Sequence, residues 1–124
     1  MESYAVIDLR IPEVDDFRFA LDVVELLDET EQPINLTGGV TTLTVRKSYD
    51  ATTADLTIAS SDPIPDVVND ATNGLISVLL RKAKRSAFPK GYVGVYDIVF
   101  TDSTGLNTTI ALGEFQCVRS VKAV

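Results

Sequence analysis

Three aspartates at four-residue spacing lie in one polar segment, and they are the first candidates for a site with chemistry. In "SSDPIPDVVND", the carboxylates of Asp62, Asp66 and Asp70 are oxygen ligands of the kind that Ca²⁺ prefers. The segment lacks the D-x-[DN]-x-[DN]-G spacing of a calcium loop and its terminal glutamate. Aspartate beside proline and asparagine is also typical of turns. We therefore favour turn chemistry over calcium and expect no metal site.

A basic cluster follows at "RKAKR", and its side chains could contact phosphate groups. The formal net charge of −7 opposes non-specific binding of nucleic acid, and no aromatic platform for single strands accompanies the cluster. A solvated connecting turn and a contact with a protein partner remain open. The candidate protein-interaction residues here are Arg81, Lys82, Lys84 and Arg85.

Groups that could perform catalysis are scarce. The chain has no histidine, the commonest general base and metal ligand near neutral pH. It also has no G-x-S-x-G elbow and no Gly-rich phosphate loop of the Walker or dinucleotide kind. Cys117, near Phe115 and Val118, is typical of a thiol in a core strand, whereas a reactive thiol would need a basic, exposed setting. We expect a protein that is not an enzyme and that uses no cofactor and no small-molecule substrate.

Period-two alternation dominates the chain and predicts strands. In "YVGVYDIVF", Tyr96, Ile98 and Phe100 share one face, while Val95 and Val99 share the other with Asp97. Similar stretches occur at 17–23, 40–48, 54–60, 74–81 and 107–118. The segment 60–73 is rich in turn residues and is predicted to be a loop, and "RKAKRSAF" predicts a short helical turn at about 81–88. This pattern indicates an all-β fold, an antiparallel β-sandwich.

Asp102 and Gly105 favour a turn that pairs residues 92–101 with 107–118 as a hairpin. Gly113 lies between Leu112 and Phe115, and keeping both of these inward requires a one-residue slip, so we expect a β-bulge there. The alternation predicts that the following side chains are largely buried: Phe19, Leu21, Leu43, Val45, Ile58, Val78, Tyr96, Ile98, Phe100, Leu112 and Phe115.

The first residues form a predicted arm that differs from the rest of the chain. We expect 1–16 to be an extended N-terminal arm and 17–124 to be a single domain, since a chain of 124 residues has the usual size of one domain. The arm lacks the features of a secretory signal, and no apolar run approaches the ~20 residues that span a bilayer, so we expect no membrane contact. Its apolar stretch "YAVIDLRI" suits addition to the sheet edge of a partner. The candidate interaction residues there are Tyr4, Val6, Ile7, Leu9 and Ile11.

Charge is distributed unevenly along the chain. Through Glu31 there are ten acidic and two basic residues, a net of −8, while the remaining nine basic and eight acidic residues net +1. Such a distribution suits head-to-tail contact between subunits of a homo-oligomer, with the acidic N-terminal third of one copy against the "RKAKR" turn of the next. We expect that reversing the four basic residues leaves the fold intact.

The second half of the chain carries a family resemblance. The segments "FPKGYVGVYDIVFTDSTG" and "LGEFQCVRSV", within Leu43 to Val121, resemble a family of small phage-associated proteins. More loosely, the chain is similar to the N-terminal immunoglobulin-like domain of phage baseplate upper proteins. The resemblance rests on positions that shape the fold and transfers no active site. It implies an immunoglobulin-like β-sandwich.

The resemblance also implies a structural virion protein of a tailed phage, assembled in the host cytoplasm and contacting other virion structural proteins. An assembly or adaptor subunit of the tail, baseplate or fibre-attachment region is the expected function. Two alternatives are a capsid decoration (cement) protein and a carbohydrate- or ligand-binding sandwich module. The second lacks support because the tyrosines are scattered and tryptophan is missing.

Overall fold

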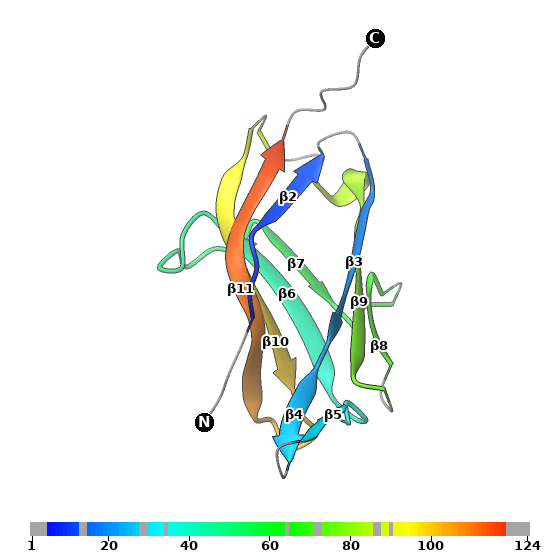
Figure 1. Ribbon diagram of the computed structural model, residues 1–124. Coiled ribbons are helices and arrows are strands. Elements are labelled where there is room, and N and C mark those ends of the chain that lie inside the picture. The colour runs from blue at the N-terminus through cyan, green and yellow to red at the C-terminus, as the bar shows by residue number, and fades with distance from the viewer. Residues whose placement is uncertain are drawn as a thin grey trace.

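The structure is a computed structural model of the chain, and it describes residues 5–12, 15–27, 30–33, 35–63, 65–70, 73–85, 88–89 and 91–118. These residues form two main β-sheets that pack face to face, with one short 3₁₀ turn (Figure 1). The predicted fold class, an all-β sandwich, is confirmed.

The larger sheet is built around the C-terminal hairpin. Its strands, in spatial order, are β1 (Ala5–Val6) with β2 (Leu9–Pro12), β11 (Asn107–Val118), β10 (Val93–Thr101), β6 (Val40–Arg46) and β7 (Leu56–Ala59). The N-terminal strands β1 and β2 pair with β11 in parallel, and the other pairs are antiparallel. The first and last strands of the described chain therefore lie side by side (Figure 1).

The smaller sheet has the strand order β3 (Phe17–Asp22), β9 (Leu75–Leu80) and β8 (Val67–Asp70). The order β11-β10-β6-β7 opposite β3-β9-β8 is that of an immunoglobulin-like sandwich, in which a G-F-C-C′ sheet faces a B-E-D sheet. The prediction of a loop over 60–73 is wrong for β8. This strand has only four residues between turn-forming neighbours, so it shows no periodicity that the sequence could reveal.

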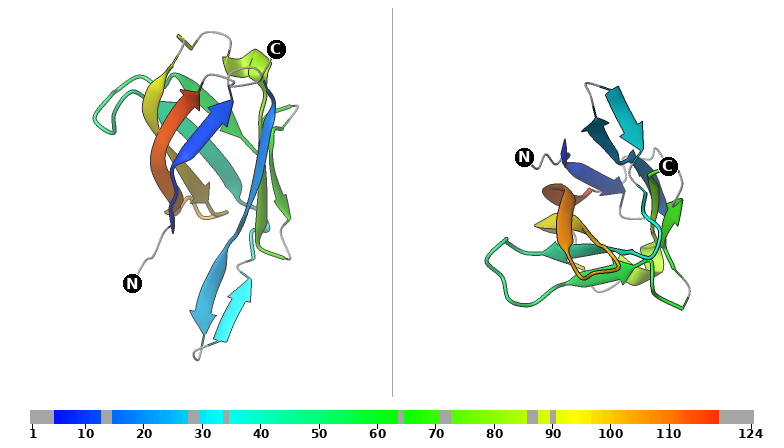
Figure 2. Two further views of the ribbon diagram at one scale, coloured as in Figure 1. Left: turned by 45° about the horizontal axis from the view of Figure 1, so that its top comes forward. Right: turned by 90° about the horizontal axis from the view of Figure 1, so that it is seen from below.

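A second element that the sequence did not reveal is a hairpin between β3 and β6. It consists of β4 (Val24–Leu27) and β5 (Thr30–Pro33), and it extends away from the two main sheets (Figure 2). The predicted helical turn is confirmed as a 3₁₀ turn at Lys82–Arg85, directly after β9.

The core lies between the two sheets and agrees with the alternation in most positions. Eight predicted core residues are buried: Leu43, Val45, Ile58, Val78, Tyr96, Ile98, Phe100 and Phe115. Phe19 and Leu21 are half-buried and pack against this core. Cys117 is also buried, so the interpretation as a core thiol is confirmed. Leu112 is the exception, because it is half-buried on the opposite face of its strand.

The β-bulge occurs three residues before the predicted position. Ile98 pairs with Ala111 and Val99 pairs with Thr109, so Ile110 is the extra residue, while Gly113 pairs regularly with Tyr96. Ala111, Gly113, Phe115 and Cys117 consequently face the core. The expected bulge at Gly113 is therefore wrong, and so is the inward orientation of Leu112.

The predicted turn between β10 and β11 is confirmed, with Asp102 at its centre. The carboxylate of Asp102 accepts hydrogen bonds from the backbone N–H groups of Thr104 (2.9 Å) and Leu106 (3.0 Å). Hydrogen bonds from Thr104 and from these backbone groups hold the pKa of Asp102 below its usual value. Gly105 has φ of +90°, a conformation that glycine adopts without strain.

Candidate interaction surface

The side of the larger sheet that faces away from the smaller sheet carries side chains of an unusual composition for a solvated surface. Side chains alternate along each strand, so Val95, Asp97 and Val99 of β10 point outward, opposite to the buried Tyr96 and Ile98, as the alternation predicted. The strand register sets Leu112, Asp97, Thr44 and Thr57 in one row across four strands.

We call this surface the outer face. Its apolar members include Val6, Val93, Val95, Val99 and Leu112. Its threonines include Thr42, Thr44, Thr57 and Thr109. Its charged strand residues are Arg10, Arg46, Asp97 and Glu114. Val6 is 69% exposed and Val93 is 54% exposed, so apolar groups on this surface reach solvent.

Asp97 lies near the centre of the outer face. Its Oδ2 atom is 4.0 Å from Nη1 of Arg46, which is too far for a hydrogen bond, and the two side chains are 28% and 34% exposed. Burial raises the pKa of Asp97, and the positive charge of Arg46 offsets this only in part. The sheet thus holds a half-buried carboxylate that is not hydrogen-bonded to the neighbouring Arg46 of the same copy.

The N-terminal segment is extended, as expected, but residues 5–12 lie in their own domain's sheet. Leu9 and Ile11 are buried, opposite Phe115 and Cys117 of β11. The prediction that these two side chains dock on a partner is therefore corrected, since they belong to the core. Val6 and Ile7 are exposed, and Tyr4 lies outside the described residues.

Side-chain hydrogen bonds with β10 and β11 hold this N-terminal segment in place. The carbonyl of Ile7 accepts a hydrogen bond from the hydroxyl of Tyr96 at 2.6 Å, and a carboxylate oxygen of Asp8 accepts one from the backbone N–H of Glu114 at 3.0 Å. A Cβ at Gly113 would lie 2.1 Å from the Ile7 carbonyl oxygen, so only glycine leaves room for this arrangement. Burial, together with the nearby Tyr49 and Asp8, raises the pKa of Tyr96 to about 12.

The basic turn, residues 81–85, makes most of its contacts within the chain. Nε of Arg81 and Nζ of Lys84 each lie 2.8 Å from a carboxylate oxygen of Asp66, whose side chain is fully buried. Burial would raise the pKa of Asp66, but hydrogen bonds and charges from Lys84 and Arg81 outweigh it and hold that pKa below its usual value. The side chains of Arg81 and Lys84 stay 45% and 38% exposed. Lys82 is exposed, and its backbone N–H donates to Asp16 at 2.8 Å.

Arg85 is buried, with 5% of its surface exposed. Its guanidinium group donates to the backbone carbonyls of Pro12 (3.0 Å), Asp15 and Leu80 (3.4 Å). This contact joins the end of β2 to the end of β9 and therefore links the two sheets. The expectation that reversing all four basic residues leaves the fold intact is corrected, because three of the four stabilise the fold.

Replacing Asp66 with asparagine should lower the free energy of unfolding at pH 7 by about 1 to 2 kcal/mol, because it removes a charged acceptor of two partly exposed cations. The pKa of Asp66 in the fold lies below its usual value. Its contribution is therefore present above that value and is lost as the pH falls through the lower, folded value. Urea unfolding at several pH values between 7 and 2 measures the free energy of unfolding. As the pH falls, this free energy should decrease less for Asp66→Asn than for the wild type. Parallel curves for the two proteins would contradict this role.

The other two aspartates of the polar segment also bond locally. Asp62 accepts a hydrogen bond from the backbone N–H of Ala59 at 3.0 Å, and Asp70 accepts one from the side chain of Asn73 at 3.0 Å. Among the described residues, no group of three or more acidic, cysteine or histidine side chains could hold a metal ion. In the same part of the chain, no helix is long and apolar enough to cross a membrane.

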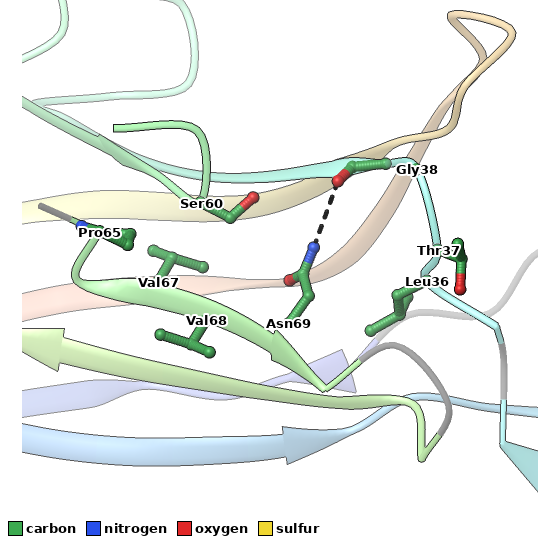
Figure 3. A pocket seen from close by; sticks show the side chains of 9 residues that line it. Leu36, Thr37, Gly38, Ser60, Pro65, Val67, Val68 and Asn69 are labelled. Carbon is green, nitrogen blue, oxygen red and sulfur yellow. Dashed lines mark hydrogen bonds between the residues drawn. The ribbon is translucent and has the colours of Figure 1, made fainter. Parts of the chain in front are cut away.

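A pocket of about 370 Å³ lies between β8 and the loop that leads into β6 (Figure 3). Its lining comprises Leu36, Thr37, Gly38, Gly39, Ser60, Pro65, Val67, Val68 and Asn69. The side chain of Asn69 accepts a hydrogen bond from Thr41 Oγ1 at 2.7 Å and donates a long one to the Gly39 carbonyl at 3.5 Å. None of these lining residues is aromatic, so the pocket offers no ring on which a sugar could stack.

The sequence interpretation missed the outer face as a candidate site, although a signal was present. In "VGVYDIV", the residues of β10 that point outward are almost as apolar as those that point inward, which is unusual for a strand with one solvated face. No protein-family model matches the chain, and no curated protein matches it. The family resemblance therefore stays a prediction.

Proposed function

We propose that the protein is a non-enzymatic assembly subunit of a tailed-phage virion that acts by binding other virion proteins. The observation that carries the binding function is the outer face, where apolar side chains of β1 and β10 reach solvent beside half-buried threonines. Exposed valines beside threonines, with few charged residues around them, suit a protein–protein interface better than a solvated sheet face. The phage assignment rests on the sequence resemblance of "FPKGYVGVYDIVFTDSTG" and "LGEFQCVRSV".

The resembling segments occupy structural positions that shape the sandwich. They supply β10, the turn at Asp102 to Gly105, and the part of β11 around Gly113 that accommodates the N-terminal strand. A tail, baseplate or fibre-attachment subunit is the preferred location, and a capsid decoration protein is the alternative.

The test is detection of the protein in virions. An antiserum raised against the purified protein should label a band in gradient-purified particles from a strain that encodes it, in amounts comparable to other structural proteins. Electron microscopy with the same serum should then distinguish tail from capsid. If the serum labels the protein only in the soluble fraction and no band appears in the purified particles, the proposal is contradicted.

A further inference from the structure

We propose that the outer face is an interface between two copies of this chain, in which Arg46 of each copy pairs with Asp97 of the other. This inference rests on the proposed function as an assembly subunit and identifies the surface that performs it. A second copy is the occupant because the charges of this face complement themselves.

The charge balance of the outer face differs from that of the whole chain. Its strand residues include two bases, Arg10 and Arg46, and two acids, Asp97 and Glu114, so the charges on these strands balance in a chain of net charge −7. Two copies can therefore bring these faces together without the repulsion that the molecule's overall charge would impose elsewhere. A strongly basic or strongly acidic partner would have no such match.

The geometry of Arg46 and Asp97 supplies the specific contact. They lie on the neighbouring strands β6 and β10, offset by two residues, because Arg46 is opposite Val95 and Asp97 is opposite Thr44. Within one copy the two charges stay 4.0 Å apart. In a two-fold symmetric interface each contact occurs twice, so four charges of alternating sign can form one cluster. Each half-buried Asp97 then gains a second cation.

Apolar burial would supply most of the affinity around this cluster. Val95, Val99 and Leu112 are half-buried beside Asp97, and Val93 is exposed on the same strand as Asp97. Sheets that pack face to face in this way bury alternate residues of both, as the two sheets of the sandwich do. Charged pairs at such an interface mainly fix the register and the choice of partner.

The experiment uses reciprocal charge reversal and sedimentation velocity over a concentration series. The wild type should dimerise, and Arg46→Asp and Asp97→Arg should each weaken self-association by roughly a hundredfold or more, since each places like charges together twice. Mixing the two variants should restore a dimer, because every contact between the copies is then between opposite charges. An internal pair within one copy cannot produce this rescue.

Two further variants keep the result interpretable. Val93→Arg places a charge on an exposed apolar residue of the same face. It should weaken the dimer even though the Arg46 and Asp97 pairs between the copies are kept. Ser77→Arg changes an exposed residue of β9 on the outside of the smaller sheet and should have no effect. A wild type that stays monomeric, a mixture that fails to associate, or a dimer lost only in Ser77→Arg would each overturn the inference. A monomer that is still found in virions would leave the proposed function standing.

Discussion

Replacing Arg85 with methionine should lower the free energy of unfolding by about 3 kcal/mol, the largest loss that we expect from any residue of the basic turn. The guanidinium group donates hydrogen bonds to the carbonyls of Pro12, Asp15 and Leu80. Only 5% of the surface of Arg85 is exposed. Methionine fills similar volume but donates no hydrogen bond, so these three buried or part-buried carbonyl groups each lose a charged donor. Urea unfolding followed by circular dichroism measures the change.

Lys82→Met is the matched control, because it removes a positive charge from the same 3₁₀ turn. The side chain of Lys82 is exposed, and the hydrogen bond to Asp16 uses its backbone N–H, which the substitution keeps. Its effect should stay within about 0.5 kcal/mol. Equal effects of the two substitutions would show that the turn depends on charge alone and not on the buried contacts of Arg85.

A variant with all four basic residues reversed would lose the links from Arg85 to β2 and from Arg81 and Lys84 to Asp66. Any loss of association in that variant would follow from a damaged fold. Lys82, whose side chain is exposed, is the member of the cluster at which charge reversal probes partner binding alone.

Alternation predicted the strands of the core well because each of them has one buried face. β6 has the burial pattern expected of a period of two, and so does β10. The turn at Asp102 and Gly105 was also predictable, since its hydrogen bonds connect residues at most four positions apart. Local chemistry determines such features.

Contacts between distant parts of the chain were not predictable in this way. The partner of Arg81 is 15 residues away, and the Pro12 carbonyl is 73 residues from Arg85. A single sequence contains no signal for such pairs, so the basic turn resembled a solvated or partner-binding surface. The N-terminal segment posed the same problem, because its pairing with β11 spans most of the chain.

The misplaced bulge has a physical explanation in the same long-range contact. Glycine often marks a bulge, but Gly113 is needed for another reason, which is the approach of the Ile7 carbonyl. The extra residue of β11 is instead Ile110, a β-branched residue with no distinctive sequence signal. Bulge and close approach both favour glycine, and only the structure separates them.

Replacing Gly113 with alanine should release the N-terminal segment from the sheet. The added Cβ would lie 2.1 Å from the oxygen and 2.7 Å from the carbon of the Ile7 carbonyl group, and neither backbone atom can yield without moving the strand. The hydrogen bond from Tyr96 to Ile7 would be strained or lost. We expect a loss of up to about 3 kcal/mol in the free energy of unfolding, the upper range for overpacking a core position.

Hydrogen–deuterium exchange locates the damage. In Gly113→Ala, residues 5–12 should exchange much faster, while β6 and β9 keep their protection, because their pairing does not involve the N-terminal segment. Gly105→Ala is the control glycine: its φ of +90° makes alanine costly by about 1 to 2 kcal/mol, but nothing lies within 4 Å of its added Cβ. That variant should lose stability without faster exchange at residues 5–12. If residues 5–12 are as well protected from exchange in Gly113→Ala as in the wild type, the Ile7 contact does not anchor the N-terminal strand.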